Sequence, residues 1–193
     1  RQVFDRAAEF GRDVDRHEQA IRAAKYPLLT DQQAATMSPG LLDINDVYCA
    51  ADWLAAHYQQ RVLRVLRATH VCALLTGFAF ISYTDIGSQR LLIFAILALM
   101  LTAVGITTIA SRRAWHRRYL DYRALAEGLR VQFYWAAAGV TSGNVSKFAH
   151  DNFLQMQDPE LGWIRNVMRV AGTECDVAAN QDPAGVQFVV DEW

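Results

Sequence analysis

The hydrophobic residues of this chain concentrate in its middle, between flanks where apolar and charged residues alternate. Residues 91–110 (LLIFAILALMLTAVGITTIA) contain no charged side chain. That run is longer than the roughly 10–14 apolar residues usual in a buried core helix, and it matches the ~20 residues that cross a bilayer. Together with the apolar run before it, it predicts a transmembrane hairpin with spans of about 68–84 and 91–110.

The first of these spans is short. Residues 69–84 extend about 24 Å at ~1.5 Å per residue, whereas the hydrocarbon layer is about 30 Å thick. Arg67 is therefore expected at the membrane boundary, with its guanidinium extended to the headgroups. The connection between the spans, residues 85–90 (DIGSQR), is so short that it predicts antiparallel neighbours.

The N-terminal flank predicts two segments. Residues 1–26 place apolar side chains at helical spacing, which predicts an amphipathic helix. Residues 30–40 (TDQQAATMSPG) are polar and end in Pro-Gly, which predicts a linker. From Leu41 a helical period runs without proline or glycine into the first span.

The C-terminal flank also predicts helices. A helix is expected to continue past the second span to about Ala138, where glycines follow. Aspartate before proline, as at Asp158 and Asp182, is a helix-start signal that predicts helices at 159–175 and 183–193.

We therefore expect an all-α membrane protein, a two-helix transmembrane hairpin with long cytoplasmic helical extensions and short C-terminal helices. The chain starts at Arg1 and stops inside an apolar run at Trp193, so we also expect it to be part of a longer protein. The expected segments are an N-terminal amphipathic helix and linker at 1–40, the hairpin at 41–138 and a cytoplasmic helical region at 139–193.

Arginine distribution predicts the orientation. Seven arginines flank the two spans on one side, whereas the connecting loop has only Arg90. Because cytoplasmic flanks carry the excess of basic residues, both chain ends are expected in the cytoplasm. The residues expected at the membrane boundary are Arg61, Arg64, Arg67, Arg112, Arg113 and Trp115.

Composition and motifs argue against several functions. The net charge of −1 gives no reason to expect nucleic-acid binding. The sequence has no phosphate-binding glycine loop, no recognisable nucleophile motif and no His/Cys cluster at metal-ligand spacing. We therefore expect no catalytic residue, no cofactor, no metal and no enzyme activity.

Register across the hairpin suggests an ion-pair network. If the turn centres near residues 87–88, facing positions sum to about 175, which pairs Asp52 with Arg123. Arg123, Glu127 and Arg130 follow one another at the spacing of intrahelical ion pairs. The alternative is that each of these side chains is separately solvated.

A few polar residues interrupt the apolar spans. Small and hydroxyl residues there favour helix packing, within the hairpin or between copies of the chain. His70 lies at the membrane entry, where an ionisable group is either functional or a neutral interfacial histidine. The candidates for pore lining or polar membrane contacts are His70, Thr76, Thr102 and Thr107.

The layout resembles the SLATT class of bacterial two-transmembrane effector domains over about residues 43–175. The resemblance rests on a helix leading into a span (ADWLAAHYQQRVLRVLRATH), a short loop, a second span and the segment SRRAWHRRYLDYRALAEGLRVQFYW. Residues 122–135 are the most distinctive part of that last segment. The resemblance implies a membrane effector of a bacterial defence system, in the inner membrane, beside a nucleotide-sensing domain or partner protein.

Two functions are compatible with these observations. The first is an effector that forms homo-oligomers in the lipid bilayer and opens a pore or perturbs the membrane. The second is a passive membrane anchor or signal-transducing module for an attached soluble domain. A pore requires several chains, because two spans cannot enclose one.

Overall fold

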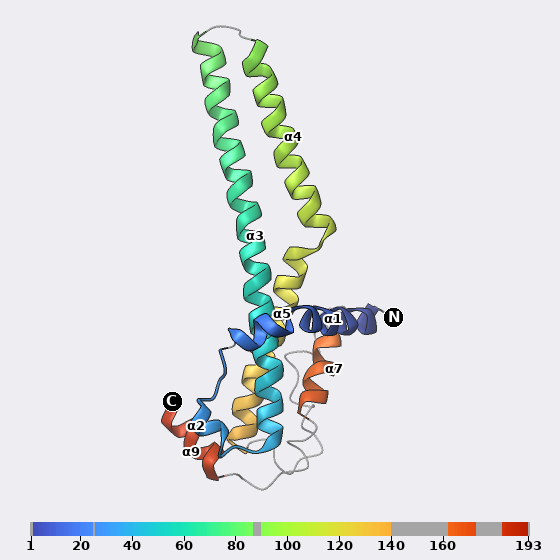
Figure 1. The fold of residues 1–193 in the computed structure, drawn as a ribbon, viewed down its shortest axis with the longest axis vertical. Helices are drawn as coiled ribbons and strands as arrows, with labels where there is room; N and C mark the ends of the chain where they lie inside the picture. The colour runs from blue at the N-terminus through green and yellow to red at the C-terminus, as the bar shows by residue number, and fades with distance from the viewer. Residues whose placement is uncertain (1, 25, 87–89, 140–161, 173–182, 193) are drawn as a thin grey trace. The chain divides into compact units, whose positions relative to one another are not determined.

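The computed structural model describes residues 2–24, 26–86, 90–139, 162–172 and 183–192 (Figure 1). Every regular element in these ranges is an α-helix, so the all-α prediction is confirmed. The seven helices are α1 (Gln2–Ala23), α2 (Asp31–Ala34), α3 (Pro39–Ile86), α4 (Arg90–Arg112), α5 (Trp115–Ala137), α7 (Gly162–Ala171) and α9 (Pro183–Glu192).

The chain divides into two compact units. Unit 1 comprises residues 1–55 and 120–193, and unit 2 comprises residues 56–119. Helices α3 and α5 each contribute residues to both units. This spatial grouping differs from the linear division at residues 40 and 138 expected from the sequence, and that division stays a prediction.

The predicted linker contains a short helix. Thr30 caps α2 in a reciprocal arrangement, because its hydroxyl accepts from the Gln33 backbone N–H while the Gln33 side chain accepts from the Thr30 N–H. Helix α3 then begins at Pro39, two residues before the expected Leu41. Proline suits a first helical position because its missing N–H has no helical partner there.

Unit 1 has a conventional apolar core. Phe10 of α1 lies against Tyr122 of α5 and Trp163 of α7, with ring centroids 5.6 and 6.0 Å apart. Fully buried side chains from α3 and α5 complete this core, namely Ile44, Leu54, Leu125, Leu129 and Phe133. Burial of each such side chain is worth roughly 1.5–3 kcal/mol.

Helix α9 approaches α5 closely. Phe188 packs against Phe133 and Tyr134, with both pairs of ring centroids 6.0 Å apart. A Cβ on Gly185 would lie 2.7 Å from the Ala137 carbonyl oxygen, so glycine is required for this contact. Helix α9 therefore packs directly against the C-terminal end of α5.

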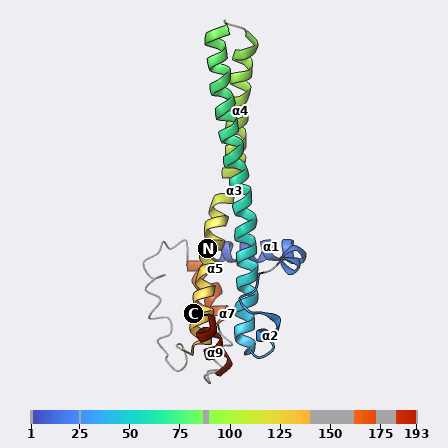
Figure 2. The same ribbon diagram turned by 90° about the vertical axis from the view of Figure 1, so that its left-hand side faces the viewer.

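Unit 2 contains the hairpin of α3 and α4. The two helices run alongside each other in both views (Figures 1 and 2). Partly buried positions recur every three or four residues along each helix, as at Cys72, Thr76 and Ala79. This spacing marks the face that each helix presents to its neighbour.

The expected continuous helix beyond the second span is wrong. Helix α4 ends at Arg112 and α5 begins at Trp115, because Ala114 adopts a left-handed conformation with φ 51°. A left-handed residue cannot continue a right-handed helix, and it costs about 1–2 kcal/mol for a residue with a Cβ. No proline or glycine marks this break in the sequence.

The C-terminal helices follow their predictions in part. Helix α5 ends as expected before Gly139, whose φ of 68° is the usual glycine terminator. Helix α7 is described over Gly162–Ala171, and α9 over Pro183–Glu192. Asp158, Asp182 and the remaining ends of the predicted helices lie outside the described residues.

Candidate functional site

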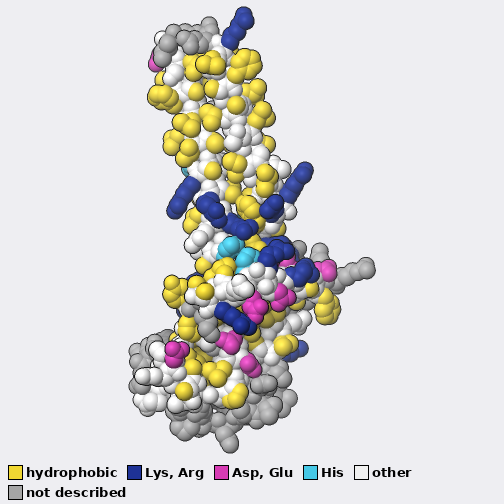
Figure 3. Space-filling model, viewed as in Figure 1, with side chains coloured by type: hydrophobic (Ala, Val, Ile, Leu, Met, Phe, Trp, Pro, Cys, Tyr) yellow, Lys and Arg dark blue, Asp and Glu magenta, His cyan; other side chains and the backbone are white. Residues whose placement is uncertain are grey.

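The apolar surface of the hairpin is the most unusual feature of the described chain. Helices α3 and α4 each contain an 18-residue window that is long and apolar enough to cross a membrane, and no residue of either window is buried. Figure 3 shows the hairpin surface as mostly hydrophobic, with several basic side chains gathered at one end of it. The structure therefore has two candidate transmembrane helices, identified by length and composition.

Exposure separates these helices from the core helices of a water-soluble domain. Leu74, Phe78, Leu91 and Phe94 are between 67% and 75% exposed. Water-soluble proteins rarely expose a contiguous apolar patch larger than a few hundred Å². Helix α4 alone has 23 residues, or about 35 Å at ~1.5 Å per residue, which exceeds the ~30 Å of a bilayer core.

The polar side chains of the two spans are bonded within their own helices. The hydroxyls of Thr76, Thr102 and Thr107 donate to the carbonyl oxygens of Cys72, Ala98 and Ala103 at 2.8–2.9 Å. His70 Nδ1 lies 2.7 Å from the Leu66 carbonyl oxygen. Thr76 lies partly buried in the hairpin, whereas the other three are exposed and are not brought together by one chain.

Two of the boundary arginines lie over the ring of one tryptophan. Arg61 and Arg113 lie over the Trp115 ring, with the guanidinium carbon 5.5 and 6.0 Å from the ring centroid. The Arg61 guanidinium carbon is also 5.7 Å from the centroid of the Tyr58 ring, so cation–π interactions with two aromatic rings stabilise its position. Arg64, Arg67 and Arg112 are exposed.

The four residues of the expected ion-pair network lie together in unit 1. Arg123 donates to the Asp52 carboxylate at 3.1 Å and lies 2.5 Å from Glu127. Arg130 lies 3.6 Å from the other Glu127 oxygen. Half of the Arg123 side chain is exposed, so the solvent screens these pairs.

Tyr48 lies beside this cluster. Burial raises the pKa of its phenol above the ordinary value, the Asp52 carboxylate raises it further, and Arg130 acts in the opposite direction. Tyr48 is therefore a neutral hydrogen-bonding group near neutral pH. It is not suited to act as a base there.

Sequence reasoning missed the buried polar contacts between α1 and α5. The Tyr122 hydroxyl donates to the Asp13 carboxylate at 2.8 Å, and Asp13 is only 3% exposed. Arg6 lies 3.7 Å from Asp121, which is 6% exposed. The only sequence signal is two acids within otherwise apolar helix faces, and their partners are more than 100 positions away.

Residues 122–135, the segment expected from the sequence to be the most distinctive, have a structural role in α5. Tyr122, Leu125, Ala126, Leu129 and Phe133 are all buried. Gly128 lies so close to Met168 of α7 that a Cβ there would be 2.9 Å from the methionine sulfur. The distinctive composition of this segment is therefore also what the core of unit 1 requires.

Within the part of the chain that the structure describes, no three His, Cys, Asp or Glu side chains are grouped to hold a metal ion. Comparison with protein-family models, with curated proteins and with solved structures found no match to this chain. Function is therefore inferred from the residues and their geometry.

Proposed function

We propose that this chain is a membrane-embedded effector that oligomerises to form a pore or perturb the membrane in a bacterial defence response. The observation that supports it is the exposed apolar surface of α3 and α4. Each large apolar side chain on that surface gains about 1.5–3 kcal/mol when it leaves water. A lipid bilayer supplies that environment to both helices at once.

The charge pattern supports an orientation. Arg61, Arg64 and Arg67 precede the apolar part of α3, and Arg112 and Arg113 follow that of α4. This asymmetry supports an orientation in which that end of the hairpin lies at the negatively charged cytoplasmic face of the inner membrane. Unit 1 is then cytoplasmic, in keeping with a core of hydrophobic side chains that are buried away from solvent.

Assembly is required by geometry. Two helices enclose no pore, so a pore depends on several copies of the chain. Control by a nucleotide-sensing domain or partner protein rests on the resemblance carried by residues 122–135. Unit 1, which contains that segment, is the natural part of the chain to receive such a signal.

Reconstitution of the full chain tests this function in two steps. Resistance to alkaline extraction from vesicles measures membrane insertion, and release of an entrapped dye measures damage, with and without cyclic mono- and dinucleotides. Insertion followed by dye release supports the effector. Failure to insert contradicts the membrane proposal, and a strict monomer in nanodiscs contradicts the pore.

One observation favours the passive anchor as the second candidate. The hydroxyls of Thr76, Thr102 and Thr107 are already bonded to their own helix backbones, as lipid-facing threonines are. An anchor needs no polar stripe along a shared axis. Stable insertion without dye release under every added nucleotide is the result expected of an anchor.

A further inference from the structure

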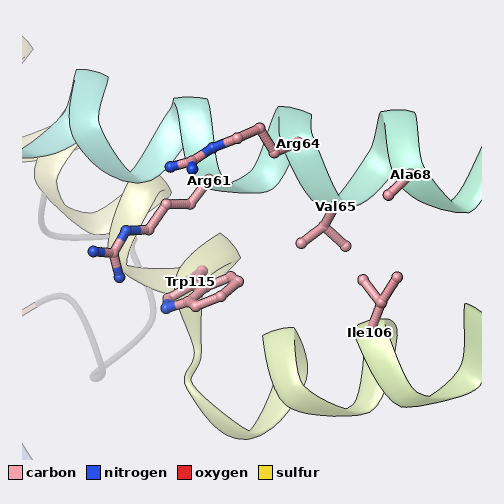
Figure 4. Close-up of a pocket in the computed structure, with 6 residues that line it drawn as sticks. All are labelled: Arg61, Arg64, Val65, Ala68, Ile106 and Trp115. Atoms are coloured by element: carbon pink, nitrogen blue, oxygen red, sulfur yellow. The ribbon is translucent and has the colours of Figure 1, made fainter. Parts of the chain in front are cut away.

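An open groove lies within unit 2, next to the break between α4 and α5. Its volume is about 340 Å³. The lining residues come from all three helices of this unit, and they are Arg61, Arg64, Val65, Ala68, Ile106 and Trp115 (Figure 4). No residue role predicted from the sequence accounts for a groove here.

The groove has a cationic part and an apolar part. Arg61 extends from α3 at the Trp115 end of the groove, and Arg64 extends back along α3 toward Arg61 (Figure 4). Val65 and Ile106 point toward one another farther along the hairpin (Figure 4). This change of polarity follows the sequence of α3, where the last arginine before the apolar run is Arg67. The groove is therefore amphipathic along the direction in which a bilayer changes from headgroup to hydrocarbon.

The two arginines retain hydrogen-bond donors for a ligand. Among the residues that the structure describes, no carboxylate lies within ion-pair distance of either guanidinium. Arg64 donates its Nε to the Gln60 carbonyl oxygen at 3.4 Å, which leaves its two terminal nitrogens. Arg61 lies against the Tyr58 and Trp115 rings, which orient the guanidinium without neutralising it.

The helix break adds to the positive potential. Because Ala114 is left-handed, a new helix begins at Trp115, at the edge of the groove. The first N–H groups of a helix have no helical acceptor, and the N-terminus carries partial positive charge. Guanidinium groups and a helix N-terminus favour the same ligand, an anion with several oxygens.

We propose that this groove binds an anionic phospholipid. The headgroup phosphate lies on Arg61 and Arg64, Trp115 lies at the glycerol level, and the start of an acyl chain lies over Val65, Ala68 and Ile106. A neutral phosphatidylcholine binds less well because its choline ammonium adds a cation next to two arginines. The site deepens the proposed function, since it requires the hairpin to be in a membrane.

Lipid binding to the full chain tests the proposal. Delipidated protein in detergent is titrated with phosphatidylglycerol or with phosphatidylcholine of the same acyl chains, and bound lipid is counted by native mass spectrometry. Two basic residues, each worth roughly fivefold near anionic lipid, predict about 25-fold tighter binding of phosphatidylglycerol. Equal affinity for the two lipids overturns the proposal.

A matched pair of variants separates the groove from general electrostatics. Arg61→Gln with Arg64→Gln is expected to lose most of the preference for phosphatidylglycerol. Arg67→Gln with Arg112→Gln removes the same charge from exposed arginines that do not line the groove, and it is expected to keep the preference. An equal loss in both pairs overturns the proposal.

Arg64→Gln alone is a variant with little risk to folding, because it loses only a hydrogen bond to its own helix. It is expected to lower the preference for phosphatidylglycerol roughly fivefold.

Two further arms identify the source of failure. Inorganic phosphate at the concentration of bound lipid is expected to displace none of it, and full displacement means a free-phosphate site instead of a lipid site. Alkaline extraction from pure phosphatidylcholine vesicles measures insertion independently of lipid charge. Insertion without lipid preference refutes the groove alone, whereas failure to insert refutes the membrane proposal itself.

Discussion

Leu54 and Leu74 lie on the same helix, α3, yet Leu54 is fully buried and Leu74 is 75% exposed. Leu54 belongs to unit 1, where α1, α5 and α7 surround the apolar face. Leu74 belongs to unit 2, where α4 runs alongside α3 (Figures 1 and 2). Unit 1 buries a core of hydrophobic side chains within the chain, whereas the candidate membrane spans of unit 2 leave theirs exposed. In the proposed function, a lipid bilayer covers them. Fold stability and membrane insertion are therefore expected to respond to different residues.

Truncation of a matched pair of phenylalanines gives the largest expected effect. Phe133 in unit 1 is fully buried, and Phe94 in unit 2 is 67% exposed. Phe133→Ala is expected to lower the free energy of unfolding by about 3–5 kcal/mol, because it leaves a cavity in the core. Phe94→Ala is expected to cost less than about 1 kcal/mol. Denaturant titration in detergent, followed by near-ultraviolet circular dichroism, measures both values, and equal costs contradict the division into two environments.

Arginine substitution of two equally exposed leucines sharpens the comparison. Leu97 in α4 is 52% exposed and Leu120 in α5 is 51% exposed. Leu97→Arg is expected to disfavour membrane insertion by about 2.5–3.5 kcal/mol, the cost of a charge near the bilayer centre. Leu120→Arg is expected to change unfolding by no more than about 0.5 kcal/mol, as at a water-exposed surface. If the fraction resistant to alkaline extraction is the same for both variants, the hairpin faces water.

Loss of the buried hydrogen bond in unit 1 has an intermediate expected effect. Tyr122→Phe leaves one oxygen of the nearly buried Asp13 carboxylate without its donor. Hydrogen bonds to charged groups contribute about 1.5–3 kcal/mol, so unfolding should become easier by that amount. Thermal unfolding in detergent measures the change, and Tyr119→Phe, partly exposed in unit 2, serves as the control. Equal stability of the two variants means that the contact contributes nothing.

The exposed ion pair between Asp52 and Arg123 gives the smallest expected effect. A double-mutant cycle with Asp52→Asn and Arg123→Gln is expected to give a coupling of about 0.2–1 kcal/mol, because both side chains are partly solvated. The coupling should decrease as salt rises from low to physiological concentration. A coupling well above this range, insensitive to salt, contradicts a solvated surface pair.

The hairpin was predictable because it depends on local composition. An uncharged run such as residues 91–110 has a clear length, and a short connection fixes the register across the turn. The same register placed Asp52 opposite Arg123, and the structure has their side chains 3.1 Å apart. These features follow from helical geometry and chain connectivity alone.

The features that were missed depend on conformation or on distant partners. Alanine is a strong helix former, so nothing in the sequence indicates that Ala114 is left-handed. The pairing of Asp13 with Tyr122 spans 109 positions, beyond the reach of local patterns. Helix α2 was also missed, because residues 30–40 were predicted to be a linker, although Thr30 and Gln33 have the spacing of a capping box.

The division into units has a consequence for synthesis. Unit 1 is assembled from two stretches of chain, and the whole of unit 2 lies between them. Phe10 packs against Tyr122 and Trp163, which are synthesised after the hairpin. These core contacts therefore cannot form until the hairpin has left the ribosome. At about 5–20 residues per second the delay lasts roughly 6–30 seconds. If the hairpin enters a membrane as proposed, the order of synthesis lets it do so before the core of unit 1 can close.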